Sequence, residues 1–231
     1  MERIPTYIWR LDRELNGGIP KNSVILIQGA PGTYKTSLSY YILYRNAKEN
    51  GRGSVFITTD IPKDRLVKHL ESMRIYPEDV DPLVKIVDIA SMRKKEKKIL
   101  PLWIDTITEK IKENIENAEL LVIDNINVLD FIDDPIERRT TIFEFLEMLR
   151  DLGVTSILTS EVASWDIPTE YEHLVDGVLK TRKVRISPVE YQIHMGIEKM
   201  MYTKHSFSYY TILFEDGRFQ LAKVIREEYR F

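Results

Sequence analysis

The fold of this chain is decided by the stretch Ser23-Val24-Ile25-Leu26-Ile27-Gln28-Gly29-Ala30-Pro31-Gly32-Thr33-Tyr34-Lys35-Thr36. Its first six residues form an apolar run that is too short for a helix and ends at a glycine loop. Such a run is typical of a strand buried on both faces of a parallel sheet. Helix formers follow over residues 36–49, and Gly51 supplies a stop. The stretch therefore predicts a strand, a loop and a helix in direct succession.

The same succession repeats further along the chain. Short apolar runs predict strands, and segments with apolar residues every three or four positions predict the helices between them. Alternating strands and helices favour the α/β class, with a central parallel sheet between two layers of helices. We expect further strands over 55–58, 84–87, 120–123 and 155–159, and helices over 62–73, 103–115 and 136–152.

After about residue 177 the pattern changes to the alternation of β-strands. Strands are expected over 177–185, 191–201, 209–214 and 218–221, and Asp216-Gly217 is a typical hairpin turn. No linker precedes this part, so we expect antiparallel strands that extend the same sheet. Residues 1–231 are accordingly interpreted as a single domain with a C-terminal β extension over about 177–222.

The loop after the first strand has the composition of a phosphate-binding loop. Backbone N–H groups at the start of a helix bind anions, Lys35 would reach the β- and γ-phosphates, and the Thr36 hydroxyl would bind Mg²⁺. Tyr34 stands where such loops have glycine, so its side chain should distort the loop or turn outward over the nucleotide. An ordinary glycine-rich turn is the alternative. The nucleotide-binding candidates are Gly29, Ala30, Pro31, Gly32, Thr33, Tyr34, Lys35, Thr36 and Ser37.

A second candidate for the metal site is Asp124, which ends the apolar run 120–123. A carboxylate at the end of a neighbouring parallel strand can hold Mg²⁺ together with the loop hydroxyl. Many strands of α/β proteins end in aspartate, so this assignment depends on the loop upstream. We therefore predict Thr36 and Asp124 as the magnesium residues.

Composition excludes several other classes of protein. The chain has 231 residues, no cysteine, four histidines and a formal charge of −3. The absence of cysteine excludes disulfides, thiolate metal sites and cysteine nucleophiles. A slightly acidic total does not support a nucleic-acid footprint over the whole surface. No apolar run approaches about 18 residues and the first residues lack a signal segment, so we expect a cytoplasmic protein with no membrane span.

Two further segments give the chain a family resemblance. Leu11-Asp12-Arg13-Glu14-Leu15-Asn16-Gly17-Gly18-Ile19-Pro20 and Glu172-His173-Leu174-Val175-Asp176-Gly177-Val178 resemble segments of the RecA/KaiC-like ATPases. The similarity is strongest to small archaeal single-domain KaiC-like proteins and to RadA-type recombinase paralogues. It implies a three-layer RecA-like fold with parallel strand order 5-1-4-3-2 and a C-terminal antiparallel extension. It also implies ATP and Mg²⁺ as ligands and a homo-oligomer, commonly a hexameric ring or a filament.

The resemblance also implies catalytic residues. Asp60 aligns with the first residue of the family's usual Glu-Glu pair, but Ile61 replaces the second. Glu161 matches a position that could orient water. Lys199 matches a cation that acts on the neighbouring subunit's nucleotide, whereas Met201 stands at the family's arginine position. A positioned base contributes about 10² to 10⁴ and an arginine finger about 10³ to 10⁵ to turnover, so hydrolysis should be slow.

Three functions remain open from the sequence. The first is a Mg-ATP-binding oligomeric switch with slow or partner-dependent ATP hydrolysis. The second is a recombinase paralogue that binds single-stranded DNA, for which Trp165 and the basic run 93–98 would be candidate contacts. The third is a degenerate interaction module that does not hydrolyse ATP. Salt-dependent DNA binding would favour the second, and absence of nucleotide binding would favour the third.

Overall fold

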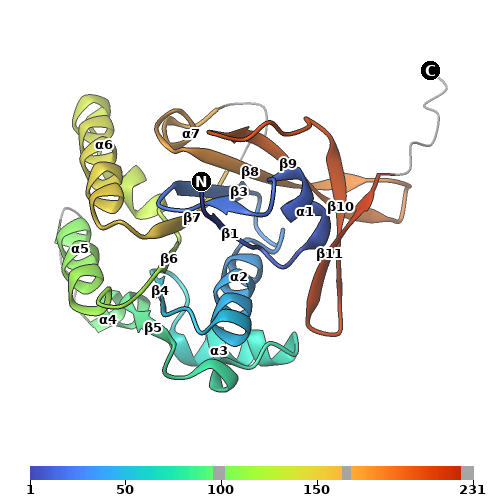
Figure 1. Cartoon of the computed structure of the whole chain (residues 1–231). Coiled ribbons are helices and arrows are strands. Elements are labelled where there is room, and N and C mark those ends of the chain that lie inside the picture. The colour runs from blue at the N-terminus through green and yellow to red at the C-terminus, as the bar shows by residue number, and fades with distance from the viewer. Residues whose placement is uncertain (96–101, 163–167, 225–231) are drawn as a thin grey trace.

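The computed structural model describes residues 1–95, 102–162 and 168–224. Within these residues nine strands form one sheet in the order β11-β10-β9-β8-β3-β7-β6-β4-β5 (Figure 1). A separate antiparallel pair, β1 (Arg3–Ile4) and β2 (Ile19–Pro20), lies near the N-terminus. The strands of the large sheet are β3 (Val24–Gly29), β4 (Ser54–Thr58), β5 (Val84–Asp88), β6 (Leu120–Asp124), β7 (Thr155–Glu161), β8 (Gly177–Arg185), β9 (Tyr191–Met200), β10 (Tyr209–Glu215) and β11 (Arg218–Lys223).

The order of the parallel strands confirms the expected RecA-like topology. β8, β3, β7, β6 and β4 are the fifth, first, fourth, third and second strands of the 5-1-4-3-2 order, and β5 adds an edge strand beyond it. β9, β10 and β11 continue the sheet antiparallel from β8, as the alternation after residue 177 predicts. The C-terminal strands therefore extend the sheet that carries the loop.

Helices cover both faces of the sheet because its central strands are apolar on both faces. In β3, Ile25 and Ile27 point to one core cluster and Val24 and Leu26 to the other. The first face is covered by α1 (Trp9–Glu14), α2 (Lys35–Asn50), α3 (Lys63–Ser72) and the short η1 (Pro77–Val80). The second is covered by α4 (Ile89–Lys95), α5 (Leu102–Asn114), η2 (Asn127–Phe131), α6 (Pro135–Asp151) and α7 (Glu170–Leu174) (Figure 1).

The C-terminal end of β9 differs from the expectation. The predicted strand 191–201 ends at Met200, and Met201 lies in the following turn with 41% of its surface exposed. A register shift also interrupts the β8–β9 pairing between Val178 and Leu179. The strand therefore ends one residue earlier than predicted, and strand alternation does not set the direction of the Met201 side chain.

The segment 11–20 owes its composition to close backbone packing. The Asp12 carboxylate accepts hydrogen bonds from Thr6 N (2.7 Å), Thr6 Oγ1 (2.7 Å) and Tyr7 N (3.0 Å). Gly18 has φ +132°, and a Cβ there would lie 2.1 Å from the carbonyl oxygen of Ile4. Only glycine fits this contact. The segment thereby fixes the chain that leads into β3.

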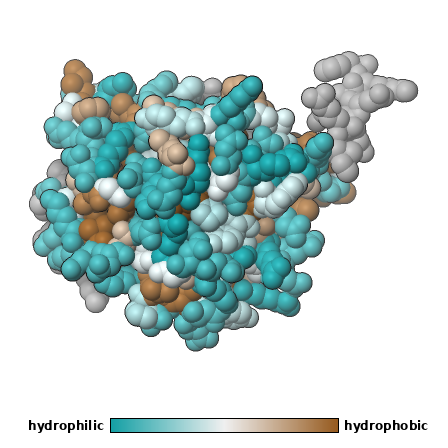
Figure 2. Space-filling model, viewed as in Figure 1, coloured by the Kyte–Doolittle hydropathy of each residue, from teal (hydrophilic) through white to brown (hydrophobic). Residues whose placement is uncertain are grey.

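Among the described residues, no helix is long and apolar enough to cross a bilayer. On the face that Figure 2 shows, the hydrophobic side chains form small separate groups among hydrophilic ones.

Trp165 and residues 96–98 of the basic run lie outside the described residues. The structure therefore does not test these candidate DNA contacts.

Candidate functional site

The loop and Asp124 lie at the carboxyl ends of neighbouring parallel strands, where α/β proteins commonly bind ligands. β3 leads into the loop and α2, while β6 ends at Asp124 and β7 at Glu161. An open pocket of about 450 Å³ lies beside the loop. Its walls are formed by the loop, the start of α2, one face of α3 and the end of β7. The lining residues are Gly32, Thr33, Tyr34, Lys35, Thr36, Ser37, Ile61, Arg65, His69 and Glu161.

Glycines and one lysine set the shape of the loop. A Cβ on Gly29 would lie 2.2 Å from Thr181 Oγ1, so β3 can approach β8 only with glycine there. Gly32 has φ +74° and faces open space. The ammonium of Lys35 turns back over the loop and donates to Ala30 O at 3.0 Å. The loop is therefore a concave backbone turn with a cation at its mouth, which is the geometry of an anion site.

Lys35 is the buried cation of this site. Its side chain is only 6% exposed, and its ammonium lies 3.6 Å from the carboxylate of Glu161, which is half exposed. Burial lowers the pKa of the Lys35 amine, while the charges of Glu161 and Asp124 oppose that shift. A buried cation is stabilised by an anion brought close to it. Phosphate oxygens would provide such a partner.

Tyr34 has a left-handed backbone conformation, with φ +69°. Phosphate-binding loops use glycine at this position because positive φ strains other residues by about 1–3 kcal/mol. The ring of Tyr34 turns toward the hairpin of β10 and β11, where it lies 6.3 Å from the ring of Phe214 and 5.7 Å from that of Phe219. The loop thus keeps the backbone conformation of a glycine, and contacts with the hairpin offset the strain.

Asp124 and Thr36 fit a magnesium site. Asp124 is 6% exposed, accepts the hydroxyl of Thr159 at 2.5 Å and interacts with the hydroxyl of Thr36. Burial raises the pKa of the Asp124 carboxyl, and these hydroxyls with the nearby Lys35 oppose the rise. A hydroxyl and a carboxylate are oxygen ligands of the kind that Mg²⁺ takes when phosphates supply further ligands. The donor set fits the ion.

Asp60 lies next to this site on the loop that follows β4. Thr59 connects the two strand ends, since its backbone N–H donates to Asp124 O at 2.8 Å. The Asn125 amide donates to the Asp60 carboxylate at 2.6 Å. Neighbouring Ile61 lines the pocket. Asp60 is therefore held at the same sheet edge as Asp124 by a side chain that the sequence did not single out.

Sequence reasoning missed two residues of the pocket, Arg65 and His69. Both lie on the exposed face of α3, four residues apart, while Leu66 and Leu70 are buried beneath them. His69 Nε2 lies 2.9 Å from Ser37 Oγ, so α3 contacts the first turn of α2. A basic residue and a histidine at i, i+4 on the helix after Asp60 are a weak signal for such a contact. Their direction depends on tertiary packing.

Comparisons with known proteins agree with this geometry. The family model described as "ATPase: KaiC" matches residues 4–225. This chain belongs to the KaiC-like ATPase family. A UPF0273 protein of Saccharolobus solfataricus is 30% identical over 89% of this chain and 78% of its own length. A UPF0273 protein of Thermotoga maritima is 29% identical over 89% of this chain and 90% of its own length.

A solved structure supports the fold of this KaiC-like chain. The crystal structure of a KaiC-like protein from Pyrococcus horikoshii superposes with a TM-score of 0.81 and 24% identity, over 95% of this chain and 98% of the other. The RecA-like α/β architecture is thereby established. The loop between β3 and α2 accordingly belongs to a P-loop ATP-binding fold.

Lys199 of this KaiC-like chain lies away from the pocket. Its ammonium donates to Val175 O at 2.5 Å and to Glu172 O and His173 O at 3.3 Å each. It therefore caps the last carbonyl groups of α7, where a cation is favourable. Its expected action on a neighbouring subunit's nucleotide stays a prediction, and these contacts would have to break for it.

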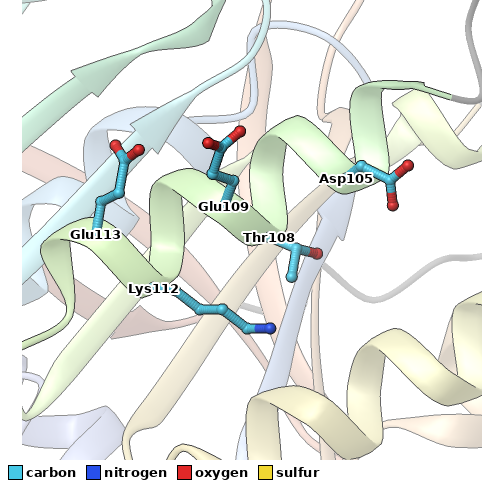
Figure 3. A pocket seen from close by; sticks show the side chains of 5 residues that line it. All are labelled: Asp105, Thr108, Glu109, Lys112 and Glu113. Atoms are coloured by element: carbon cyan, nitrogen blue, oxygen red, sulfur yellow. The ribbon is translucent and has the colours of Figure 1, made fainter.

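A second pocket, of about 550 Å³, lies along α5. Those of its lining residues that the structure describes all come from this one helix (Figure 3). Figure 3 shows Glu109 and Glu113 extending from one side of α5, with Lys112 and Thr108 extending from the other. Among the described residues, no group of three or more His, Asp or Glu side chains is arranged to hold a metal.

Proposed function

We propose that this chain binds ATP with Mg²⁺ beside residues 29–37 and hydrolyses it slowly, as the nucleotide switch of a homo-oligomer. One observation carries the proposal: the buried cation Lys35 and the buried carboxylate Asp124 flank Thr36 at the carboxyl edge of the sheet. An ordinary glycine-rich turn does not need two buried charges of opposite sign, since burying each of them is costly. A phosphate-bound magnesium site does need them.

The chain's own residues divide the work as follows. Backbone N–H groups of the loop bind the phosphates, and Lys35 exchanges Ala30 O and Glu161 for phosphate oxygens. Thr36 and Asp124 would hold the ion. Bound Mg²⁺ neutralises charge on the phosphates. Asp60 offers a carboxylate that can accept a proton from water, and Asn125 fixes its position.

Two departures from the family pattern and the contacts of Lys199 support slow turnover. Ile61 supplies no second carboxylate beside Asp60. Met201 is an uncharged side chain in an exposed turn, and the Lys199 ammonium is bound to carbonyls of its own chain. The charge that develops on the transferred phosphoryl group therefore lacks its usual compensation from a neighbouring subunit. Hydrolysis is expected to require a partner or to proceed slowly.

An ATP titration by calorimetry, with and without Mg²⁺, tests this proposal. Wild type should bind ATP more tightly with Mg²⁺, and Lys35→Ala should weaken binding by about 10² or more, since it removes a charge-assisted contact. Lys112→Ala, on the exposed side of α5, is the control. Equal affinity of wild type and Lys35→Ala would remove the site assignment. Salt-dependent binding of single-stranded DNA by wild type would favour the recombinase alternative instead.

A further inference from the structure

We infer that Arg65 binds the terminal phosphate of ATP within its own subunit and supplies the cation that the chain lacks at Met201. This inference rests on the proposed function. Arg65 lines the pocket together with Lys35 and Thr36, although it is 30 residues away in sequence from Lys35. Among the described residues, none forms a hydrogen bond or an ion pair with its guanidinium. An unpaired arginine at an anion pocket is free to bind a ligand.

The position of α3 is fixed on several sides. Leu66 and Leu70 anchor the helix in the core, and each is fully buried. His69 contacts Ser37 at the first turn of α2. Two residues after α3 ends, Arg74 pairs with Asp216 at 2.5 Å, at the tip of the β10–β11 hairpin. Arg65 is therefore presented by a helix that is held in place, as a phosphate-binding residue must be.

The positions of His69 and Arg65 along α3 indicate which phosphate Arg65 approaches. His69 lies at Ser37, the residue just after the loop's lysine and threonine. Arg65 lies one helical turn nearer to the start of α3, toward Ile61 and the strand ends that carry Asp124. Lys35 and Thr36 serve the β- and γ-phosphates and the ion in loops of this type. Arg65 therefore approaches the terminal end of the phosphate chain.

The charges of the pocket agree with this assignment. Its lining side chains carry the cations Lys35 and Arg65 and the anion Glu161. Once phosphate oxygens replace Glu161 beside Lys35, Arg65 provides the second positive charge among the described residues that line the pocket. Lys68 lies on the same helix and is also exposed, but it does not line the pocket. The chain thus offers a matched control that removes the same charge from the same helix.

Calorimetry tests the inference by measuring affinity for Mg-ADP and for a non-hydrolysable Mg-ATP analogue. The proteins compared are wild type, Arg65→Ala, Arg65→Lys and Lys68→Ala. Arg65→Ala should weaken the triphosphate about 10- to 100-fold and the diphosphate much less. Arg65→Lys should recover part of the loss, and Lys68→Ala should match wild type. In ATP hydrolysis, the Arg65→Ala defect should be the same at all protein concentrations, because the arginine acts within its own subunit.

Several results would overturn the inference. Equal affinities of Arg65→Ala and Lys68→Ala for the triphosphate analogue, with Lys35→Ala defective, would reject Arg65 while the proposed function stands. Equal losses for the diphosphate and the triphosphate would reject the contact with the terminal phosphate. A wild-type protein that binds neither nucleotide in the presence of Mg²⁺ would reject the proposed function and the inference together.

Discussion

The ammonium of Lys35 and the carboxylate of Glu161 lie 3.6 Å apart at the mouth of the loop. The two residues come from the N-terminus of α2 and the end of β7, and the parallel pairing of β3 and β7 brings them together. Glu161 thus occupies the side of Lys35 that a phosphate would approach. Nucleotide binding has to displace this carboxylate or reorient it.

Replacing Glu161 should therefore separate affinity from turnover. Glu161→Gln removes the competing anion, and because Glu161 is half exposed, ATP affinity should rise only about two- to fivefold. Turnover should fall, by about tenfold or more, if the carboxylate orients water as the family resemblance implies. Calorimetry and phosphate release measure the two effects. Glu144→Gln, on the exposed face of α6, is the control, and an unchanged affinity in Glu161→Gln would contradict the competition.

Asp124→Asn should stabilise the protein in the absence of ligands and impair its magnesium site. The folded-state pKa of Asp124 is raised by burial, so the native state binds the proton more tightly than the unfolded state. This group's contribution to stability consequently falls as pH rises above its ordinary value near 4. Asparagine carries no charge, so it avoids the cost of burying an ionised carboxylate, and its side-chain oxygen can still accept the hydrogen bond from the Thr159 hydroxyl.

The melting temperature of Asp124→Asn should therefore exceed that of wild type by a few degrees at pH 7 and by less at pH 4. Its ATP affinity should no longer respond to Mg²⁺. A variant that melts lower than wild type at pH 7, with Mg²⁺ still strengthening ATP binding, would show that Asp124 is a structural residue.

Two substitutions at Tyr34 should differ in stability. Tyr34→Ala loses the ring contacts with Phe214 and Phe219 but keeps a side chain at φ +69°. Tyr34→Gly loses the same contacts and relieves the strain. We expect the alanine variant to be less stable than wild type by about 2 kcal/mol and the glycine variant to recover about 1 kcal/mol of it. Urea unfolding measures both, and equal stability of the two variants would argue against backbone strain.

Lys199→Ala should lower the stability of the folded protein. Removal of the cation that caps α7 should cost about 1–2 kcal/mol and lower the melting temperature by a few degrees. Lys204→Ala, in the exposed segment after β9, should leave it unchanged. Turnover per subunit is then measured across protein concentration. A loss confined to concentrations at which subunits assemble would show that Lys199 also serves a neighbour's nucleotide.

Sequence patterns predicted the parts of this protein that depend on local order. The loop after β3, Asp124 at the end of β6 and the antiparallel strands after residue 177 follow from short runs of residues. The directions of Lys199 and Arg65 do not, because a bulge in the β8–β9 pairing and the packing of α3 determine them. Lys199 contacts residues 24 to 27 positions away, and the α3 contact between His69 and Ser37 spans 32 positions, which a periodic pattern does not encode.

The contact between Tyr34 and Phe219 has a consequence for how the protein folds. The two residues are 185 positions apart, so the phosphate-binding loop gains its support from β11, the last strand that the structure describes. Contacts of such long range form late, because closing a long loop costs entropy before any contact compensates for it. During synthesis the loop should stay without this support until the hairpin has left the ribosome. In refolding experiments, the ability to bind ATP should therefore return with the slowest phase.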